Sequence, residues 1–221
     1  MEIHILTLFP EMITHAVSQS VLGRAQKAGV FSVQAHNLRD WTQDAHRTTD
    51  DRPFGGGQGM IMMIEPIDRA LNSLGAKKGT PQQKIILTSA KGTLYSQQVA
   101  QAWISFSKLF IICGHYEGVD ERVAQYLVDE EVRIGNYVLT GGELPALVMV
   151  DSVARLLPNA LGNEQSAIEE SFMREGYLEY PQYTRPSEYN GLSVPEVLTQ
   201  GNHKDITDWK NQHAQQLLEE K

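Results

Sequence analysis

The paired glycines Gly141 and Gly142 mark the stretch whose residue types best suit a bound ligand. Residues 133–139, which precede them, are rich in β-branched and aromatic side chains that favour extended backbone. Glycine can adopt a positive φ and lets a ligand approach the main chain closely. Pro145 is pre-set for the first turn of a helix, and apolar residues recur at helical spacing behind it. The pattern predicts a ligand cradle, although an ordinary strand-turn-helix connection would share it.

A second candidate for binding lies between Arg39 and Gly59, where the sequence shows no hydrophobic periodicity. Loops of this length in a compact domain are usually functional or disordered. Trp41, several arginines and a cluster of glycines favour a binding role over a mobile surface loop. No Gly-Lys-Ser/Thr follows the glycines, so the loop is not a P-loop.

The sequence offers little support for covalent, metal or hydride chemistry. Cys113 is the only cysteine and ends an apolar run, so we expect it to be buried and inert. The seven histidines include no pair at three- or four-residue spacing, which argues against a zinc site. No Gly-x-Gly-x-x-Gly motif is present, and a nicotinamide-dependent oxidoreductase is therefore disfavoured.

Composition indicates a globular chain with one domain of ordinary size and a small appendage. The 221 residues are 41% hydrophobic and 21% charged. The apolar runs are too short to span a bilayer and the first residues do not resemble a signal peptide, so a cytoplasmic protein without a membrane segment is expected. A formal net charge of -8 argues against a non-specific nucleic-acid coat but permits a local basic face.

Hydrophobic periodicity predicts the elements that position the two candidate segments. Strands are expected at residues 2–9, 31–38, 84–89 and 109–113, and helices at 10–29, from Pro66 to 74, at 95–106, after Asp120 and from Pro145. Because strands and helices alternate, the fold class is α/β, a mostly parallel sheet with helices on both faces.

Ligands bind beyond the carboxyl ends of the strands in such a sheet. Residues 88–90, 114–118 and 134–142 are expected to share that position, and they should converge on one pocket. After Leu161 the periodicity fails, and the polar stretch that follows reads as a linker. The remaining tail is too small to hold a core alone, so it must dock on the main domain or on a second subunit.

Five separated motifs run through the chain in order. They are Pro53-Phe54-Gly55-Gly56-Gly57, Gly114-His115-Tyr116-Glu117-Gly118-Val119-Asp120-Glu121-Arg122, Ile134-Gly135-Asn136-Tyr137-Val138-Leu139-Thr140-Gly141-Gly142-Glu143-Leu144-Pro145, Tyr183-Thr184-Arg185-Pro186 and Gly201-Asn202-His203. Together they resemble the bacterial tRNA (guanine-N1)-methyltransferase family over nearly the whole chain. The resemblance implies the SPOUT fold, in which the cofactor-binding loops are threaded into a deep trefoil knot.

The same resemblance implies a domain organisation and an assembly. It gives a cofactor-binding domain at residues 1–161, a linker at 162–175 and a small helical tRNA-binding domain at 176–221. It also implies an obligate homodimer, with each active site formed between one subunit's knot and the other subunit's linker and tail. The expected partners are therefore tRNA and a second copy of the chain.

The resemblance implies S-adenosylmethionine as cofactor and the guanine immediately 3′ of the tRNA anticodon as target. The implied cofactor-binding residues are Thr88, Ser89, Gly114, Tyr116, Glu117, Ile134, Gly135, Asn136, Tyr137, Val138, Leu139, Gly141 and Gly142. The implied RNA-binding residues are Arg47, Arg52, Gly57 and Gly59, since arginine pairs well with phosphate. Dependence on Mg²⁺ follows from the family alone, and no residues are assigned as metal ligands.

The chemistry of such a transfer requires a base and a cation. Guanine N1 carries a proton at neutral pH, which a carboxylate can remove. Negative charge then spreads to O6, where an arginine can stabilise it. The resemblance assigns these roles to Glu170 and Arg155. The family has aspartate where this chain has Glu170, and the extra methylene moves the carboxylate by on the order of 1 Å.

Other departures from the family pattern are Gln58, His115, Asn136 and an early end at Lys221, from which reduced contact with tRNA is expected. Two further functions stay open. One is a SPOUT methyltransferase acting on another RNA base. The other is a non-catalytic tRNA-binding protein with the same knot, which the glutamate at position 170 makes plausible.

Overall fold

The computed structural model describes residues 1–161, 170–174 and 176–216. The chain divides into two compact units, Met1–Gly162 and Asn163–Lys221. Of the linker expected at 162–175, only residues 170–174 belong to the described part of the chain. No helix in the described ranges has the length and apolar character needed to cross a membrane.

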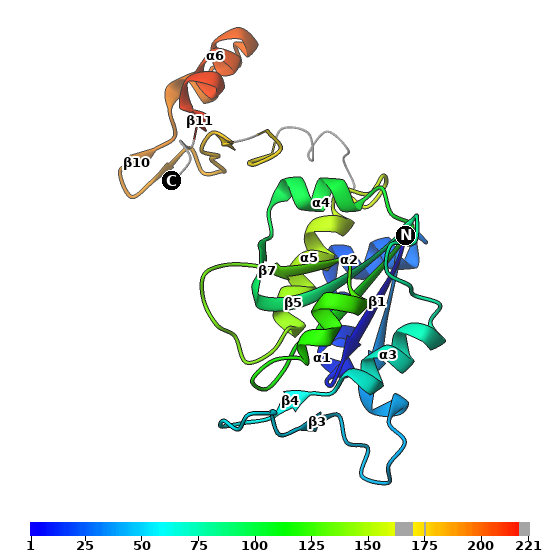
Figure 1. The fold of residues 1–221 in the computed structure, drawn as a ribbon. Coiled ribbons are helices and arrows are strands. Elements are labelled where there is room, and N and C mark those ends of the chain that lie inside the picture. The colour runs from blue at the N-terminus through cyan, green and yellow to red at the C-terminus, as the bar shows by residue number, and fades with distance from the viewer. Residues whose placement is uncertain (162–169, 175, 217–221) are drawn as a thin grey trace. The chain divides into compact units, whose positions relative to one another are not determined.

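The first unit is built on a five-stranded sheet (Figure 1). Its strands are β1 (Glu2–Thr7), β2 (Ser32–Asn37), β5 (Gln83–Leu94), β6 (Lys108–Cys113) and β7 (Glu130–Arg133). They lie in the order β2-β1-β6-β5-β7, and every pairing in this sheet is parallel. The predicted α/β class with a mostly parallel sheet is confirmed.

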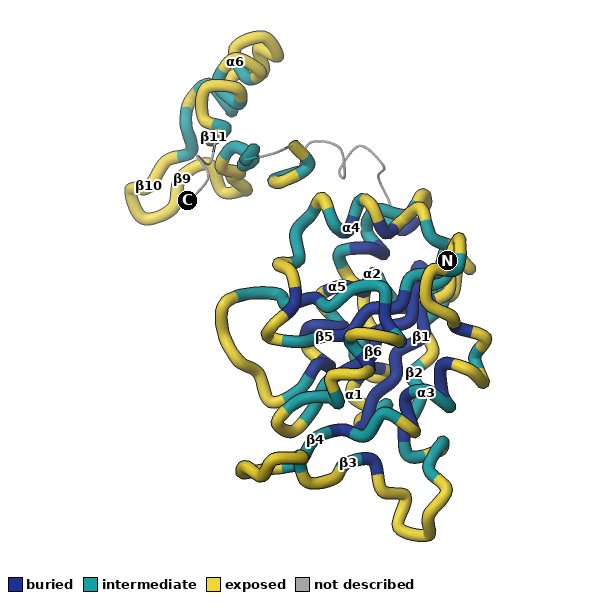
Figure 2. The backbone as a smooth tube through the Cα atoms, viewed as in Figure 1, coloured by how far each residue is buried: buried dark blue, intermediate teal, exposed yellow. Residues whose placement is uncertain are grey.

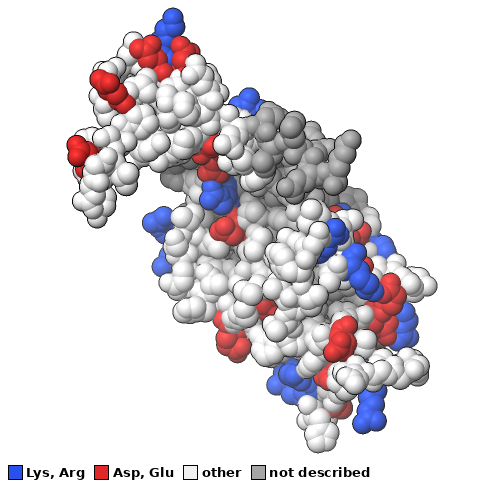
Figure 3. All heavy atoms as spheres, turned by 90° about the vertical axis from the view of Figure 1, so that its left-hand side faces the viewer, with Lys and Arg blue, Asp and Glu red and all other residues white. Residues whose placement is uncertain are grey.

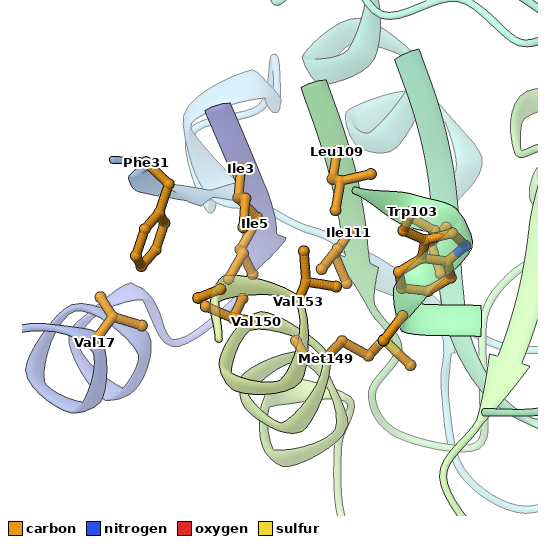
Figure 4. Packing of buried hydrophobic residues seen from close by; sticks show 14 of the residues in the cluster. Ile3, Ile5, Val17, Phe31, Trp103, Leu109, Ile111, Met149, Val150 and Val153 are labelled. Atoms are coloured by element: carbon orange, nitrogen blue, oxygen red, sulfur yellow. The ribbon is translucent and has the colours of Figure 1, made fainter. Parts of the chain in front are cut away.

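The strand side chains alternate between two hydrophobic cores, because successive residues of a strand point to opposite faces. Ile5 and Ile111 face one core, where they meet Met149 and Val153 of a covering helix (Figure 4). The helices that contribute to this core are α1 (Pro10–Val17), α2 (Ser20–Lys27), α4 (Gln97–Trp103) and α5 (Glu143–Ala154).

The opposite face of the sheet is covered by fewer helices. Leu6, Phe110 and Ile112 pack there against α3 (Ile64–Ser73) and the π-helical turn η2 (Val123–Leu127). The central strands β1 and β6 are buried on both sides, whereas the loops at their ends are exposed (Figure 2). The sheet is therefore a rigid support for the loops at its carboxyl edge.

The single helix expected at residues 10–29 is wrong, because α1 and α2 are separate helices. Ser20 has a φ of 50°, which interrupts the helical backbone. Gly23 lies so close to the preceding turn that a Cβ added to it would be 2.0 Å from the Ser18 carbonyl oxygen. The apolar residues keep helical spacing across this break, so the periodicity did not predict it.

Two expectations about strands at the site also need correction. Residues 134–137 form bends and residues 138–139 are irregular, so the strand of that region is β7, which ends immediately before them. Hydrophobic periodicity does not predict β7, because its residues are mostly charged. Charged residues are tolerated there since β7 is an edge strand, and Glu130 pairs with Lys84 at 3.0 Å. Residues 88–90 are not a loop, since β5 continues through them with a change of register between Thr88 and Thr93.

The long irregular segment forms an arm at the carboxyl edge of the sheet (Figure 1). A 3₁₀ turn, η1 (Leu38–Trp41), begins it, and β3 (Asp50–Asp51) pairs antiparallel with β4 (Ile61–Met62). We call residues 50–62 the glycine arm, because four of its glycines have positive φ.

The second unit combines short strands with a helix. Its described elements are β8 (Tyr177–Leu178), β9 (Glu188–Tyr189), β10 (Leu192–Ser193), η4 (Glu196–Leu198), α6 (His203–His213) and β11 (Gln215–Gln216). β8 pairs with β11 and β9 with β10, both antiparallel. Asn202 caps α6 by accepting a hydrogen bond from the Lys204 backbone N–H at 3.2 Å, so this helix begins before Asp205, where it was expected.

Candidate functional site

Three chain segments meet around one cavity at the carboxyl edge of the sheet. Its volume is about 1210 Å³, somewhat above the roughly 300–1,000 Å³ of typical ligand sites. Residues 87–91, 114–122, 131–135 and 137–142 line it, the glycine arm adds residues 51–54 and 61–62, and residues 63–65 follow from the start of α3. The predicted convergence of the three segments is confirmed.

The glycines of the cavity wall are required by close packing. The Gly142 N–H donates to the Gly114 carbonyl oxygen at 2.7 Å, which joins two of the segments. A Cβ added to Gly142 would lie 1.9 Å from Thr88 Oγ1 and 2.8 Å from the Cys113 Cα. Gly142 has a φ of -84° and Gly141 is also outside the positive region, so this turn needs glycine for close packing and not for its freedom to adopt positive φ.

The hydroxyl of Thr88 is already used to hold the wall together. It donates to the Ile112 carbonyl oxygen and accepts from the Gly114 N–H, each at 3.1 Å. Thr88 is 5% exposed. Its contribution to the site is therefore to fix the Gly114 turn against β5.

A buried carboxylate lies directly behind the paired glycines, and sequence reasoning missed it. Glu143 is 4% exposed and accepts a hydrogen bond from Thr7 Oγ1 at 2.7 Å. His115 Nδ1 is buried and has no hydrogen-bond partner in the part of the chain that the structure describes. Both Glu143 Oε2 and His115 Nδ1 lie within 2.6 Å of the position that a Gly141 Cβ would occupy. The only sequence signal for Glu143 was an acidic residue in the first turn of a helix, a common arrangement.

The single cysteine does not supply a nucleophile to this cavity. Cys113 is fully buried at the end of β6. Burial, with a smaller effect from the negative charge of Glu143, raises the pKa of its thiol well above the usual value. The thiol therefore stays protonated and unreactive, as its place at the end of an apolar run predicted.

Most cations on the cavity rim are engaged by neighbouring groups. Lys91 pairs with Glu121 at 2.6 Å, and this hydrogen bond raises the lysine pKa. Arg122 pairs with Asp120 at 2.6 Å and lowers the pKa of that carboxyl group.

The other two rim arginines differ from each other. Arg133 donates to the Gly92 carbonyl oxygen and to Asn136 Oδ1. Among the described residues, the Arg52 guanidinium has no hydrogen-bond or ion-pair partner. Arg52 is exposed, so it is the rim cation best able to bind an external anion.

The backbone of residues 136–140 also presents unused polar groups to the cavity. Within the described ranges, no hydrogen bond of normal geometry involves their main-chain N–H or C=O groups, although His115 and Gly141 form an isolated antiparallel bridge beside Thr140. All but Asn136 line the cavity. A planar ligand with donors and acceptors on its edge could pair with these groups, because they are ordered without being satisfied internally.

The cavity includes every residue that was expected to bind a cofactor except Asn136, which is exposed and accepts from Arg133. Of the expected RNA-binding residues, only Arg52 lines it. Arg47 instead pairs with Asp40, and its Nε donates to the Arg39 carbonyl oxygen at 3.3 Å. Gly57 and Gly59 belong to the glycine arm outside the lining.

The expected catalytic residues belong to different units. Arg155 directly follows α5, whereas the cavity lies at the opposite end of that helix, where Gly142 and Pro145 line it. A helix of 12 residues is about 18 Å long. Glu170 belongs to the second unit, where its carbonyl oxygen accepts from the Met173 N–H at 3.3 Å. The part of the chain that the structure describes contains no cluster of three or more His, Cys, Asp or Glu side chains that could hold a metal.

Comparison with known proteins gives a consistent result over the whole chain. Residues 1–220 match the family model described as tRNA (Guanine-1)-methyltransferase TrmD. The tRNA (guanine-N(1)-)-methyltransferase of Lactobacillus helveticus is 50% identical, covering 97% of this chain and 86% of the relative. Proteins of the same name from Geotalea uraniireducens and Clostridioides difficile are 47% and 42% identical, with 97% and 100% of this chain and 85% and 95% of each relative covered.

Proposed function

The chain belongs to the tRNA (guanine-1)-methyltransferase family, and we propose that it methylates N1 of the guanine immediately 3′ of the tRNA anticodon with S-adenosylmethionine as donor. The observation that carries this proposal is the cavity at the sheet edge. Its walls include residues 114–122, 134–135 and 137–142, from the segments that hold two of the family-like motifs. A tRNA substrate of this kind belongs to the cytoplasm.

The cavity fits the proposed cofactor in size and in polarity. The unpaired backbone groups of residues 136–140 suit the edge of an adenine ring. Gly114, Tyr116 and Gly141 shape the wall around them, and Glu117, which also lines the cavity, would lie beside the methionine or the guanine. Bound there, S-adenosylmethionine supplies an electrophilic methyl group. The family implies Mg²⁺ as well, and the proposal assigns no protein ligands to it.

Two side chains carry the proposed proton chemistry. Glu170 accepts the proton of guanine N1, which frees the lone pair that attacks the methyl group. Arg155 donates hydrogen bonds to O6 and stabilises the charge that develops there. Arg52, Arg47 and the glycines Gly57 and Gly59 contact the RNA.

The proposed fold is a SPOUT domain at residues 1–161 with a trefoil knot, a linker at 162–175 and a tRNA-binding domain at 176–221. The parallel order β6-β5-β7 and the hydrogen bond from Gly142 to Gly114 support the threading between β5 and α5.

We propose that the enzyme acts as a homodimer with composite active sites. Arg155 and the cavity lie at opposite ends of α5, about 18 Å apart along the helix, which supports a site completed by the arginine of a second copy. Exposed apolar side chains on α1 and α5 support an interface on these helices: Met12 is 42%, Leu144 49% and Val148 46% exposed.

The reaction is tested by transfer of labelled methyl to tRNA transcripts with guanine or adenine after the anticodon. Methylation of the guanine transcript alone, lost in Glu170→Gln, supports the proposed reaction and base. Methylation at another base points to a different SPOUT specificity. Binding of both ligands without transfer by the wild-type chain overturns the proposal in favour of a tRNA-binding protein.

Mixing two inactive variants tests the composite site. One carries Gly142→Ala, which blocks the cavity wall, and the other carries Arg155→Ala with Glu170→Gln. Mixed dimers regain one complete site if the residues come from different subunits, so activity should return when the chains are denatured and refolded together. Persistent inactivity in dimers that contain both chains contradicts the composite arrangement.

A further inference from the structure

Phe54 stands at the tip of the glycine arm with its ring fully open to solvent. Its exposed fraction is 102%, so the side chain has no role in the core. The next residues, Gly55 and Gly56, have φ values of 83° and 80°, and a Cβ on either would meet no atom of the described residues within 4 Å. These glycines turn the chain outward without packing against it. An aromatic ring displayed in this way is available to a partner.

The base of the arm is fixed to the cavity wall. The Glu117 N–H donates to the Met60 carbonyl oxygen at 3.0 Å, and the Met62 N–H donates to the Gly118 carbonyl oxygen at 2.9 Å. A Cβ on Gly59 would lie 2.3 Å from Glu117 Cγ, so the arm and the wall are in close contact there. The wall therefore holds Phe54 in reach of the cavity, which Phe54 itself lines.

The charge beside Phe54 suits a nucleotide. Arg52, two residues before it, is the rim cation that lacks a partner among the described residues. On the face drawn in Figure 3, basic and acidic side chains are interspersed, so cationic attraction is local. An arginine that can bind phosphate and an aromatic ring that can stack on a base form a site for one nucleotide.

We propose that Phe54 stacks on an unpaired nucleobase adjacent to the target guanine, while Arg52 contacts the phosphate beside it. This inference rests on the proposed function. A base that enters a cavity leaves its neighbours in the RNA without their stacking partner. An aromatic side chain at the cavity mouth replaces that partner and keeps the target extruded. Phe54 is thus a substrate-positioning residue and takes no part in bond making.

Steady-state kinetics on the full-length protein tests the role of the ring. Phe54→Ala should raise the KM for tRNA about tenfold, the size typical of one base stacked on one ring. The kcat at saturating tRNA and the Kd for S-adenosylmethionine should stay within about twofold, because the ring does not touch the reacting atoms. Phe54→Trp should keep the KM for tRNA near the wild-type value, whereas Phe54→Leu should raise it as Phe54→Ala does. Tyr126→Ala removes another exposed aromatic, outside the cavity lining, and should change nothing.

A double-mutant cycle identifies the base. Anticodon stem-loops with an abasic site on either side of the target are assayed with the wild type and Phe54→Ala. At the position where the base stacks on Phe54, its loss should raise the wild-type KM and abolish the further effect of Phe54→Ala.

The inference is overturned if Phe54→Ala leaves the KM unchanged, or if its effect is additive with both abasic sites. The second result would mean that Phe54 acts on the conformation of the arm. A wild-type chain that transfers no methyl group would instead contradict the proposed function, so the two failures can be told apart.

Discussion

Two groups of glycines border the same cavity for opposite physical reasons. Gly114 and Gly142 have ordinary φ values, and a Cβ on either would collide with neighbouring backbone or with Thr88. Gly55 and Gly56 have positive φ and open space around them. The first pair lets three segments pack into a rigid wall, whereas the second lets the arm project into solvent. A glycine cluster in a sequence can therefore mark either a packed support or a free contact surface.

The largest expected effect, on both stability and cofactor binding, comes from adding a side chain to a glycine of the packed wall. In Gly142→Ala the new methyl group would overlap Thr88 Oγ1 and press on the Cys113 Cα. Overpacking of this kind typically costs about 1–3 kcal/mol, and more where backbone must move. We expect the midpoint of thermal unfolding to fall by about 5 °C or more, with loss of S-adenosylmethionine binding by calorimetry. Wild-type stability and binding in this variant would show that the wall is as adaptable as the arm.

A second effect, nearly as large, concerns the support behind the wall. Thr7→Val removes the donor to the buried carboxylate of Glu143 and the acceptor of the Phe9 N–H. A buried polar group left unsatisfied costs about 1–3 kcal/mol, more if charged. Urea unfolding should show the loss. Thr14→Val is the matched control, because the Thr14 hydroxyl is exposed and bonds only to the Pro10 carbonyl oxygen. Equal effects of the two substitutions would contradict a special role for Glu143.

Residue patterns predicted much of the wall and little of what holds it. The apolar runs of β1 and β6 predicted the parallel sheet, because strands buried on both faces are continuously apolar. Edge strand β7 was missed, since three of its four residues are charged and Glu130 pairs across to Lys84. The hydrogen bond between Thr7 and Glu143 joins residues at opposite ends of the first unit's sequence, and local patterns carry no trace of such contacts.

In the long irregular loop and the glycine arm, sequence patterns failed to predict which arginine is free to bind. Their irregular sequence predicted a binding loop, and the RNA contacts proposed there remain predictions. The guanidinium of Arg52 is unpartnered among the described residues. Arg47 looked equivalent in sequence, yet it pairs with Asp40 within the same loop. Which of two arginines is free depends on where the chain turns, and that is set by φ values that residue type alone does not determine.

A smaller effect on stability is expected from a substitution in the glycine arm. Gly56→Ala places a methyl group in empty space, so only its φ of 80° is strained. The left-handed region costs an L-residue about 1–2 kcal/mol, and relaxation of an exposed arm should keep the loss near the lower end. Thermal unfolding should change by a few degrees at most, while the KM for tRNA rises because Phe54 is displaced. A loss of stability as large as in Gly142→Ala would remove the distinction between the two glycine groups.

The smallest expected effect is a pH dependence of the free energy of unfolding that arises in the packed sheet and not in the arm. His4 of β1 and His36 of β2 are joined by a hydrogen bond of 3.0 Å between Nδ1 and Nε2. Burial lowers the pKa of both imidazoles below the usual value. Glu2, at 3.6 Å, opposes this for His4, while Lys108 reinforces it, and the proximity of His4 adds to the effect on His36.

The folded chain therefore binds these protons less tightly than the unfolded chain does. This contribution to stability is fully present above the ordinary histidine pKa of about 6.5 and is lost progressively as the pH falls through the lowered values. Urea unfolding at about pH 7.5 and about pH 5.5 should show a lower free energy of unfolding in acid, with a smaller difference in His36→Gln. Gly56→Ala should show the same difference as the wild type, because the arm contributes no part of the histidine pair. If His36→Gln keeps the full pH dependence, the loss arises elsewhere, and acid does not separate the packed strands from the arm.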